Sequence, residues 1–178
     1  MPFRRIRIGC GAMIGHDVHF QTSRTSRITI GDRVSLNTGC HLVASEAISI
    51  GDNVAVGEYV SIRDQEHKFM PGTGVRDQGF KIAAIKIGAN VWIGRGAYIG
   101  PGSDIGPGSI IAANSVVRGV FPEHVLIAGA PATARRKILP DGKTMAIASE
   151  AMLDHVSGQT NARNSNIAAT GNERSGVE

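Results

Sequence analysis

An aliphatic residue stands directly before a glycine nine times in this chain, and several of these pairs recur every six residues. A step of six residues matches neither the 3.6-residue turn of a helix nor plain strand alternation, and it is typical of a repeat architecture. We therefore predict a parallel β-coil in which one aliphatic side chain per step points into a narrow core. Glycine is expected to supply tight backbone geometry at the corners. Three steps close a triangular coil of about eighteen residues, and coils stack about 4.8 Å apart.

The repeat falls into two blocks. The first covers residues 6–62, with a disturbance at 20–27 and a two-residue slip before Ile50, and the second covers residues 87–117 without interruption. Residues 63–86 between them are polar and glycine-rich. Because both flanking blocks are regular, we expect this segment to be a long loop extruded from one corner of the coil. Long loops on rigid scaffolds often carry function.

The end of the chain differs from the repeat. We expect a coil domain at residues 1–138 and a C-terminal segment at 139–178. A short amphipathic helix is predicted there, with Thr144 as its N-cap and Gly158 as its stop, followed by a flexible tail. The residues at helical spacing are Met145, Ala148, Met152 and Val156.

Composition narrows the function classes. Aromatic residues make up only 4% and there are 23 glycines among 178 residues, which suits a slim core of aliphatic side chains. The formal charge is 19 − 15 = +4 and no basic run alternates with aromatic residues, which argues against nucleic-acid binding. Residues 1–20 contain no apolar core of a signal peptide, and no stretch approaches the length of a membrane span. Cys10 and Cys40 are too few for a disulfide framework, so we expect reduced thiols in a cytoplasmic protein.

Over residues 28–138 the chain resembles the hexapeptide-repeat acyltransferases, and within them the O-acetyltransferases of the galactoside, maltose and polysaccharide type. The resemblance is carried by Ile87-Gly-Ala-Asn-Val-Trp-Ile-Gly94, by the closing Ala128-Gly-Ala-Pro-Ala132 with basic residues after it, and by the histidine-bearing loop. It implies an all-β fold, a left-handed parallel β-helix. It also implies acetyl-CoA as co-substrate and a homotrimer whose active sites lie between subunits.

The resemblance places the chemistry on two residues. His67 falls on the family's catalytic histidine, and Asn37 falls on its acceptor-site asparagine. The chemistry independently favours a histidine, because a neutral imidazole can take the proton of an attacking hydroxyl at cellular pH and return it to the departing thiolate. Backbone amides at a coil edge, or Asn37, would stabilise the oxyanion. Asp64 and Glu66 flank His67 and could orient its ring. The plainer alternatives are a solvated loop histidine and, for Asn37, a corner residue bonded to its own backbone.

The donor side depends on other residues. Trp92, the only tryptophan, occupies a repeat slot that points outward, which suggests an interface or a ligand wall. The resemblance assigns Trp92 to the active-site crevice and the backbone amide of Ala113 to cofactor contact. Arg135, Arg136 and Lys137 follow the last coil and would meet the phosphates of coenzyme A. Alternatively, this basic triplet is a solvated edge.

Two departures from the family pattern bear on the substrate. Gly119 stands where relatives often have a lysine, and Ser45 stands where galactoside-type enzymes carry an acidic acceptor contact. We therefore expect O-acetylation of a surface-polysaccharide unit or its precursor instead of a simple galactoside or maltose. Acetylation of a xenobiotic or antibiotic hydroxyl and a non-catalytic scaffold role remain alternatives. A zinc lyase on the same coil is disfavoured because no pair of the six histidines flanks the loop corner near His67, and we expect no metal.

Overall fold

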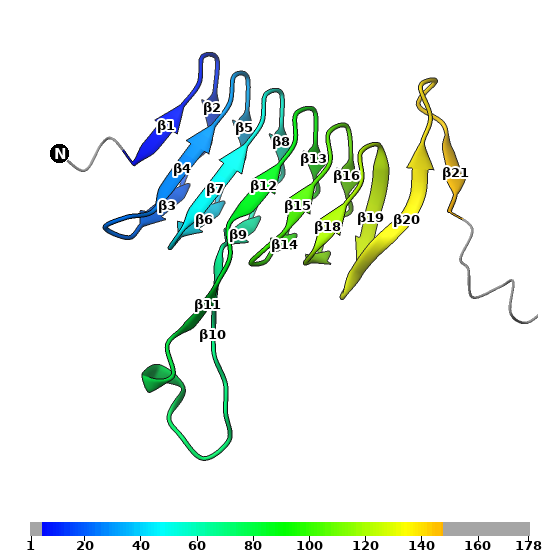
Figure 1. Ribbon diagram of the computed structural model, residues 1–178. Coiled ribbons are helices and arrows are strands. Elements are labelled where there is room, and N and C mark those ends of the chain that lie inside the picture. The colour runs from blue at the N-terminus through cyan, green and yellow to red at the C-terminus, as the bar shows by residue number, and fades with distance from the viewer. Residues whose placement is uncertain (1–4, 148–178) are drawn as a thin grey trace, which may run out of the picture. The chain divides into compact units, whose positions relative to one another are not determined.

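The computed structural model describes residues 5–147, which wind into a stack of parallel coils with three sheets as its sides (Figure 1). Sheet A contains β1 (Ile6–Ile8), β4 (Arg27–Ile30), β7 (Ala47–Ile50), β12 (Ile85–Ile87), β15 (Asp104–Ile105) and β18 (Val120–Phe121). Sheet B contains β2 (Met13–Ile14), β5 (Ser35–Leu36), β8 (Ala55–Val56), β13 (Trp92–Ile93), β16 (Ile110–Ile111), β19 (Val125–Gly129), β20 (Ala132–Ile138) and β21 (Thr144–Ala146). Sheet C contains β3 (His19–Thr22), β6 (His41–Ala44), β9 (Ser61–Arg63), β14 (Tyr98–Ile99) and β17 (Val116–Val117). The predicted parallel β-coil is confirmed.

Equivalent aliphatic residues of successive coils stack directly on one another. In sheet A the backbone register forms one inward column, which contains Ile8, Ile30, Ile50, Ile87, Ile105 and Phe121. All members after Ile8 are buried. The column is continuous although the spacing along the sequence slips, so the extra residues are accommodated at the corners and the hydrophobic core keeps its register.

The glycine of each pair has a different role from the one expected. A Cβ atom built on Gly88 would lie 2.6 Å from the backbone nitrogen of Pro107 in the next coil. The pair glycine is therefore needed for close approach between coils. The left-handed backbone conformation of the corner belongs to the residue two positions later, such as Asn90 with φ 58° or Gly108 with φ 65°. Asparagine and glycine tolerate that conformation best.

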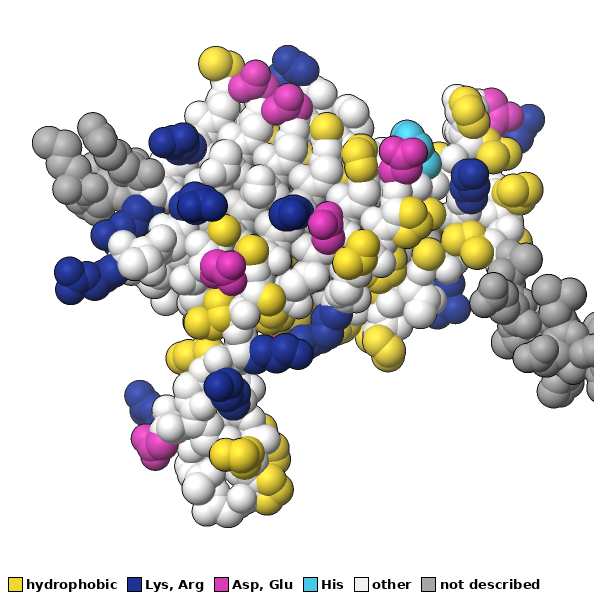
Figure 2. All heavy atoms as spheres, in the orientation of Figure 1, with side chains coloured by type: hydrophobic (Ala, Val, Ile, Leu, Met, Phe, Trp, Pro, Cys, Tyr) yellow, Lys and Arg dark blue, Asp and Glu magenta, His cyan; other side chains and the backbone are white. Residues whose placement is uncertain are grey.

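The extruded segment is a β-hairpin that leaves the coil between β9 and β12. It pairs β10 (Gln65–His67) with β11 (Phe80–Ile82) in antiparallel fashion and carries a short 3₁₀ turn at Val75–Asp77. Figure 2 shows it standing out from the coil, with hydrophobic side chains at its far end. At its base, the fully buried carboxylate of Asp64 accepts hydrogen bonds from the amides of Ser45 and Glu46 at 2.7 and 2.8 Å.

The C-terminal end of the described range is built from antiparallel strands. β19 turns back into β20, which pairs with β21, so strand pairing continues past residue 138. The prediction of a helix starting at Thr144 is wrong, because Thr144 and Met145 pair with Ile138 and Lys137 in β21. Backbone pairing with an available strand edge outweighs a helical spacing of only a few side chains. The rest of the expected helix and the expected flexible tail lie outside the described residues.

No helix among residues 5–147 has the length and apolarity that crossing a membrane requires.

Candidate active site

A groove of about 600 Å³ runs over the outer face of sheet B and its corner with sheet C. Gly57 and Gly94 are among its lining residues, and a Cβ on either would collide with the backbone of the next coil. On Gly94 the Cβ would lie 2.6 Å from the amide nitrogen of Ala113, so glycine allows the two coils to approach closely there. The Ala113 N–H has no hydrogen-bond acceptor among residues 5–147, and Ala113 is one of the residues that line the groove. The lining consists of Asn37, Gly57, Glu58, Trp92, Gly94, Arg95, Ile110, Ile111, Ala112, Ala113 and Leu126.

The side chains along this face follow a straight cross-strand row. Trp92 pairs with Ile110, Ile110 with Leu126, and Leu126 with Arg136. Directly opposed residues in neighbouring strands project from the same face, so these four side chains share one surface. Three strand steps separate Trp92 from Arg136, which corresponds to about 14 Å. Trp92, which is 57% exposed, lines the groove together with Ile110 and Leu126, and the row continues beyond this lining to Arg136.

The row distinguishes between the three basic residues of β20. Arg136 opposes Leu126 in the groove lining, whereas Arg135 falls at the irregularity in the β19–β20 pairing. Arg135 donates through Nε to the carbonyl of Ala128 at 3.3 Å, and Arg136 donates to the carbonyl of Thr144 at 3.3 Å. Arg136 is therefore the member of the triplet best aligned with the groove.

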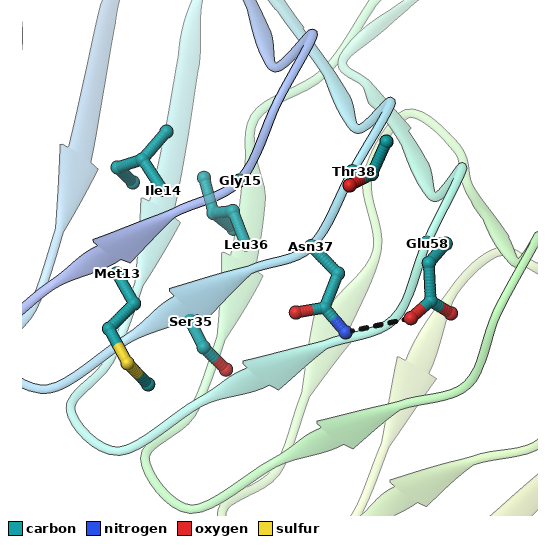
Figure 3. A pocket seen from close by; sticks show the side chains of 8 residues that line it. All are labelled: Met13, Ile14, Gly15, Ser35, Leu36, Asn37, Thr38 and Glu58. Atoms are coloured by element: carbon teal, nitrogen blue, oxygen red, sulfur yellow. Dashed lines mark hydrogen bonds between the residues drawn. The ribbon is translucent and has the colours of Figure 1, made fainter.

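A second hollow of about 350 Å³ adjoins the groove on the side of the first coils (Figure 3). Met13 and Ser35 line it, and it shares Asn37 and Glu58 with the groove. The Asn37 amide donates through Nδ2 to Glu58 Oε1 at 3.1 Å. The two hollows therefore meet at one polar pair, Asn37 and Glu58.

Glu58 was missed by the sequence analysis. Its only local signal is its position directly after Gly57, where the chain turns outward at a corner. A solvated acid at such a turn is common. Its partner Asn37 lies one coil earlier, 21 residues away in the sequence.

His67 lies on the hairpin, apart from these residues. It is exposed, it opposes Phe80 across the β10–β11 pair, and the two ring centroids are 4.3 Å apart. Asn37, Trp92 and Ala113 line the groove together, whereas His67 is not among its lining residues within one chain. The hairpin leaves from the corner between sheets C and A, and the groove lies on sheet B.

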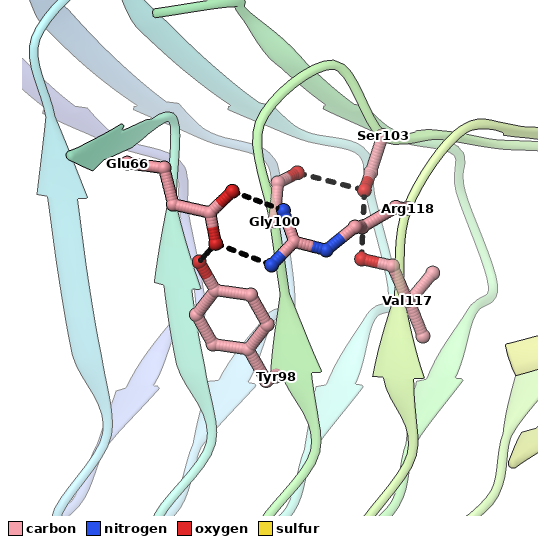
Figure 4. Close-up of polar contacts among 6 residues, drawn as sticks. All are labelled: Glu66, Tyr98, Gly100, Ser103, Val117 and Arg118. Carbon is pink, nitrogen blue, oxygen red and sulfur yellow. Dashed lines mark hydrogen bonds and ion pairs between the residues drawn. The ribbon is translucent and has the colours of Figure 1, made fainter. Parts of the chain in front are cut away.

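The two acids that flank His67 are engaged elsewhere. The Asp64 carboxylate accepts hydrogen bonds from the backbone amides of Ser45 and Glu46 at the base of the hairpin. Glu66 forms a two-point ion pair with Arg118 and also accepts a hydrogen bond from the Tyr98 hydroxyl at 3.5 Å (Figure 4). In this structure neither acid contacts the imidazole, so the idea that one of them orients the ring directly finds no support.

The charges around Glu66 act on one another. The hydrogen bonds from Arg118 lower the pKa of the Glu66 carboxyl, and Glu66 in turn raises the pKa of the Arg118 guanidinium. Burial, followed by the nearby Glu66 charge, raises the pKa of the Tyr98 hydroxyl. The Arg118 guanidinium carbon also lies 5.5 Å from the centre of the Tyr98 ring, within cation–π range. At neutral pH Glu66 and Arg118 are therefore charged and the Tyr98 hydroxyl is neutral, and the three groups form one hydrogen-bonded cluster.

Within residues 5–147, no group of three or more histidine, cysteine, aspartate or glutamate side chains is arranged to hold a metal ion.

Comparison with known proteins links this arrangement to a family. Residues 84–119 match the family described as bacterial transferase hexapeptide (six repeats). A solved galactoside acetyltransferase in complex with coenzyme A is 30% identical, with a TM-score of 0.69 over 82% of this chain and 73% of that chain.

Two curated relatives match a smaller share of their own length. A probable acetyltransferase of Mycobacterium tuberculosis is 32% identical over 67% of this chain and 42% of that relative. WbbJ of Escherichia coli K12, named for O-acetyl transfer in lipopolysaccharide biosynthesis, is 33% identical over 62% of this chain and 60% of that relative. The chain therefore spans less than two thirds of either curated relative.

The likeness to the galactoside acetyltransferase extends over most of both chains, and the coils that carry it also build the groove. The chain belongs to the family of hexapeptide-repeat acetyltransferases.

Proposed function

We propose that this protein is an acetyl-CoA-dependent O-acetyltransferase that acts on a hydroxyl of a sugar, in a surface-polysaccharide unit or its precursor. The observation that carries the proposal is the row from Trp92 through Ile110 and Leu126 to Arg136. An aliphatic track of about 14 Å that ends in a cation suits a pantetheine arm followed by a phosphorylated nucleotide. The family membership and the coenzyme A bound by the galactoside acetyltransferase support the same reading.

The acceptor is proposed to occupy the second hollow. Met13 offers an apolar surface there, Ser35 a hydroxyl, and Glu58 a carboxylate that accepts hydrogen bonds from hydroxyl groups. A mixed apolar and polar surface of this kind suits a sugar ring. The polysaccharide assignment is further supported by WbbJ, whose name refers to lipopolysaccharide biosynthesis.

His67 is proposed to complete the site from a neighbouring subunit. Within one chain it lies outside the groove, so a second copy must supply it if it is the base. We expect a homotrimer in which the hairpin of one subunit carries His67 to the Trp92 groove of the next. A closed ring of three identical contacts satisfies every interface in the assembly.

The reaction would then proceed by direct transfer. The neutral imidazole of His67 accepts the proton of the acceptor hydroxyl as its oxygen attacks the thioester carbonyl carbon. The tetrahedral intermediate carries an oxyanion, which Asn37 Nδ2 or a corner amide would stabilise with a hydrogen bond. The C–S bond then breaks, the acetyl group stays on the sugar oxygen, and the imidazolium returns its proton to the thiolate of coenzyme A.

We also expect a cytoplasmic location. Cys10 and Cys40 are both free thiols, which is compatible with a reducing compartment.

The proposal is tested with purified protein, acetyl-CoA and a panel of hydroxylated acceptors that includes polysaccharide repeat units, simple glycosides and antibiotics. Coenzyme A release and acetylated product are both measured. The His67→Ala variant is expected to lower kcat by about 10²–10⁴-fold, since it removes the proton acceptor. Its affinity for coenzyme A, measured by calorimetry, should stay close to that of the wild type because the groove lining is unchanged.

The unfolding temperature of His67→Ala serves as the control, and it should change little because His67 lies outside the coil. Near-normal sugar acetylation by this variant would contradict the mechanism. Wild-type protein that does not bind coenzyme A would favour a scaffold role. Preference for an antibiotic acceptor over every sugar would refute the polysaccharide assignment.

A further inference from the structure

The hairpin that carries His67 is attached to the coil by a contact that the reaction above does not use. Glu66 in β10 pairs with Arg118, which directly follows β17, and with the Tyr98 hydroxyl of β14. Glu66 and Arg118 are 52 residues apart in the sequence. Figure 4 shows the carboxylate facing the flat guanidinium, with the Tyr98 ring beside both groups. We call these three residues the clamp.

A clamp is needed because the hairpin has little else to hold it. A two-stranded hairpin is marginally stable in water without packing on another element. The apolar residues near its end are exposed, with Phe69 at 73% and Met70 at 63%. The Asp64 bonds fix only the point where the chain leaves the coil. Along β10, Gln65 accepts a hydrogen bond from the Ser45 hydroxyl at 2.5 Å, and Glu66 follows it as the residue nearest His67 that the coil holds through an ion pair.

The position of Glu66 in β10 couples the clamp to His67. Successive side chains of a strand point to opposite faces. Since Glu66 faces the coil and its pairing partner across the hairpin is Lys81, the adjacent His67 is directed to the other face, where its ring packs on Phe80. A rotation or shift of β10 that releases Glu66 would therefore also turn the imidazole.

We infer that Glu66, Arg118 and Tyr98 are positioning residues that hold the hairpin in one orientation and so set the direction of the His67 imidazole. The inference rests on the proposed role of His67 as the base. It assigns the flanking acid an indirect role, through the backbone of β10, in place of a hydrogen bond to the ring.

Charge explains why the clamp holds at working pH. Hydrogen bonds from Arg118, with a smaller contribution from the charge of Lys81, lower the pKa of the Glu66 carboxyl and keep it ionised. The charge of Arg63 on the neighbouring strand partly offsets the rise in the pKa of the Tyr98 hydroxyl. The bond between Arg118 and Glu66 is charge-assisted at both ends and has two contact points, which fixes an orientation as well as a distance.

The test uses the full-length protein with Glu66→Gln, Arg118→Gln and the two changes combined. Either single variant is expected to lower kcat about 10-fold with the KM for acetyl-CoA unchanged, because the base is misplaced while the donor groove is intact. The kcat of the double variant should be no lower than that of the less active single variant, since both changes remove the same contact. Asp141→Asn is the matched control. It removes the exposed Asp141–Lys143 ion pair at the far end of the coil and should leave kcat unchanged.

A second readout is independent of activity. The Phe80 ring lies 4.3 Å from the imidazole, so its ring current should displace the His67 ring-proton signal in the NMR spectrum. That signal is assigned by its loss in His67→Gln. Glu66→Gln and Arg118→Gln are expected to move it toward the position of a free histidine, and Asp141→Asn is expected to leave it in place.

The kcat values and the His67 ring-proton signal together distinguish a failure of the clamp inference from a failure of the proposed transferase function. Reduced kcat with a moved signal would support the clamp. An unmoved signal, or a moved signal with full kcat, would overturn it. Wild-type protein without any transferase activity would refute the proposed function, and a signal moved by the clamp variants would then still establish that the clamp sets the ring.

Discussion

At the scale of single residues, Asn37 shows how one departure from a repeat places a polar side chain in the groove. The corner between sheets B and C places Gly15, Asn37, Gly57 and Gly94 in equivalent slots of successive coils. Three of these are glycines because a Cβ would collide with the next coil. Asn37 alone carries a polar side chain in this column, and it reaches past Gly57 to Glu58. The sequence predicted a role for Asn37, but the carboxylate that fixes its amide could not be identified without the stacking of the coils.

The ion pair of Glu66 predicts a pH dependence of stability. Arg118 lowers the pKa of Glu66 in the folded protein below its ordinary value of 4.5, so the unfolded chain binds the proton more readily. The contribution is therefore fully present above pH 4.5 and is lost as the pH falls through the lowered folded value. Both side chains are more than a third exposed, so water and salt limit it to about 1 kcal/mol or less.

We accordingly expect wild-type protein to unfold at a slightly higher temperature than Glu66→Gln at pH 7. The difference should narrow below pH 4.5 and shrink in 1 M salt, where the Debye length is about 3 Å. Thermal unfolding followed by circular dichroism measures it. A difference that grows on acidification would contradict the assigned direction of the shift.

At the scale of elements, the coil could be predicted because its periodicity is strong. The short strands of the hairpin and β21 could not be predicted. The run from Ile87 to Val117 repeats without a break, and its strands are as expected. The strands of the hairpin lack an alternating apolar pattern, so only an extruded loop was predicted. A helix was predicted at β21 because Met145 begins a set of side chains at helical spacing and Thr144 is a suitable N-cap. The strand forms through backbone pairing with β20, which a local pattern does not encode.

The corner glycines of the groove should be sensitive to the smallest substitution. Gly94→Ala places a Cβ 2.6 Å from Ala113 N and 2.9 Å from the carbonyl oxygen of Ile111, both backbone atoms that cannot move independently. We expect a loss of about 1–3 kcal/mol of stability and weaker coenzyme A binding, measured by thermal unfolding and calorimetry. Gly74→Ala is the control, since its φ is −65° and its Cβ would meet only the flexible Asp77 side chain. Equal stability of the two variants would show that the coils can separate at this corner.

β20 allows a test within the basic triplet. Arg136 lies in the row with Leu126 and Trp92, whereas Lys137 opposes Val125, which is buried. Arg136→Ala should raise the KM for acetyl-CoA more than Lys137→Ala does, and the effect should shrink with a donor that lacks the 3′-phosphate. Steady-state kinetics with both donors measure this. A charge-assisted contact is worth about 1.5–3 kcal/mol before solvent screening, so an increase of up to about 10-fold is reasonable. Equal effects of the two variants would mean that the triplet acts as a diffuse positive edge.

At the scale of the whole molecule, the sequence singled out most residues of the candidate site but did not show where they lie relative to one another. Asn37, Trp92 and Ala113 were singled out separately, and the coil brings them to one groove. His67 belongs to an element that projects from a different corner of the coil. The distance between these parts depends on the three-sided winding and on the exit point of the hairpin. Neither is encoded near His67, which is why the sequence could not show that the candidate residues lie in two separate parts of one chain.

The separation of His67 from the Trp92 groove within one chain predicts that two inactive variants can restore activity when they are mixed. If each site combines His67 of one subunit with the Trp92 groove of the next, His67→Ala and Trp92→Ala damage different halves. Separately, both variants should be nearly inactive. After unfolding and refolding as an equal mixture, random closed trimers would contain intact pairs at about a quarter of their sites. We therefore expect about a quarter of wild-type kcat per site, with a trimer in sedimentation. A mixture that stays as inactive as its components, or an active monomer at micromolar concentration, would mean that His67 and Trp92 do not meet across a subunit boundary.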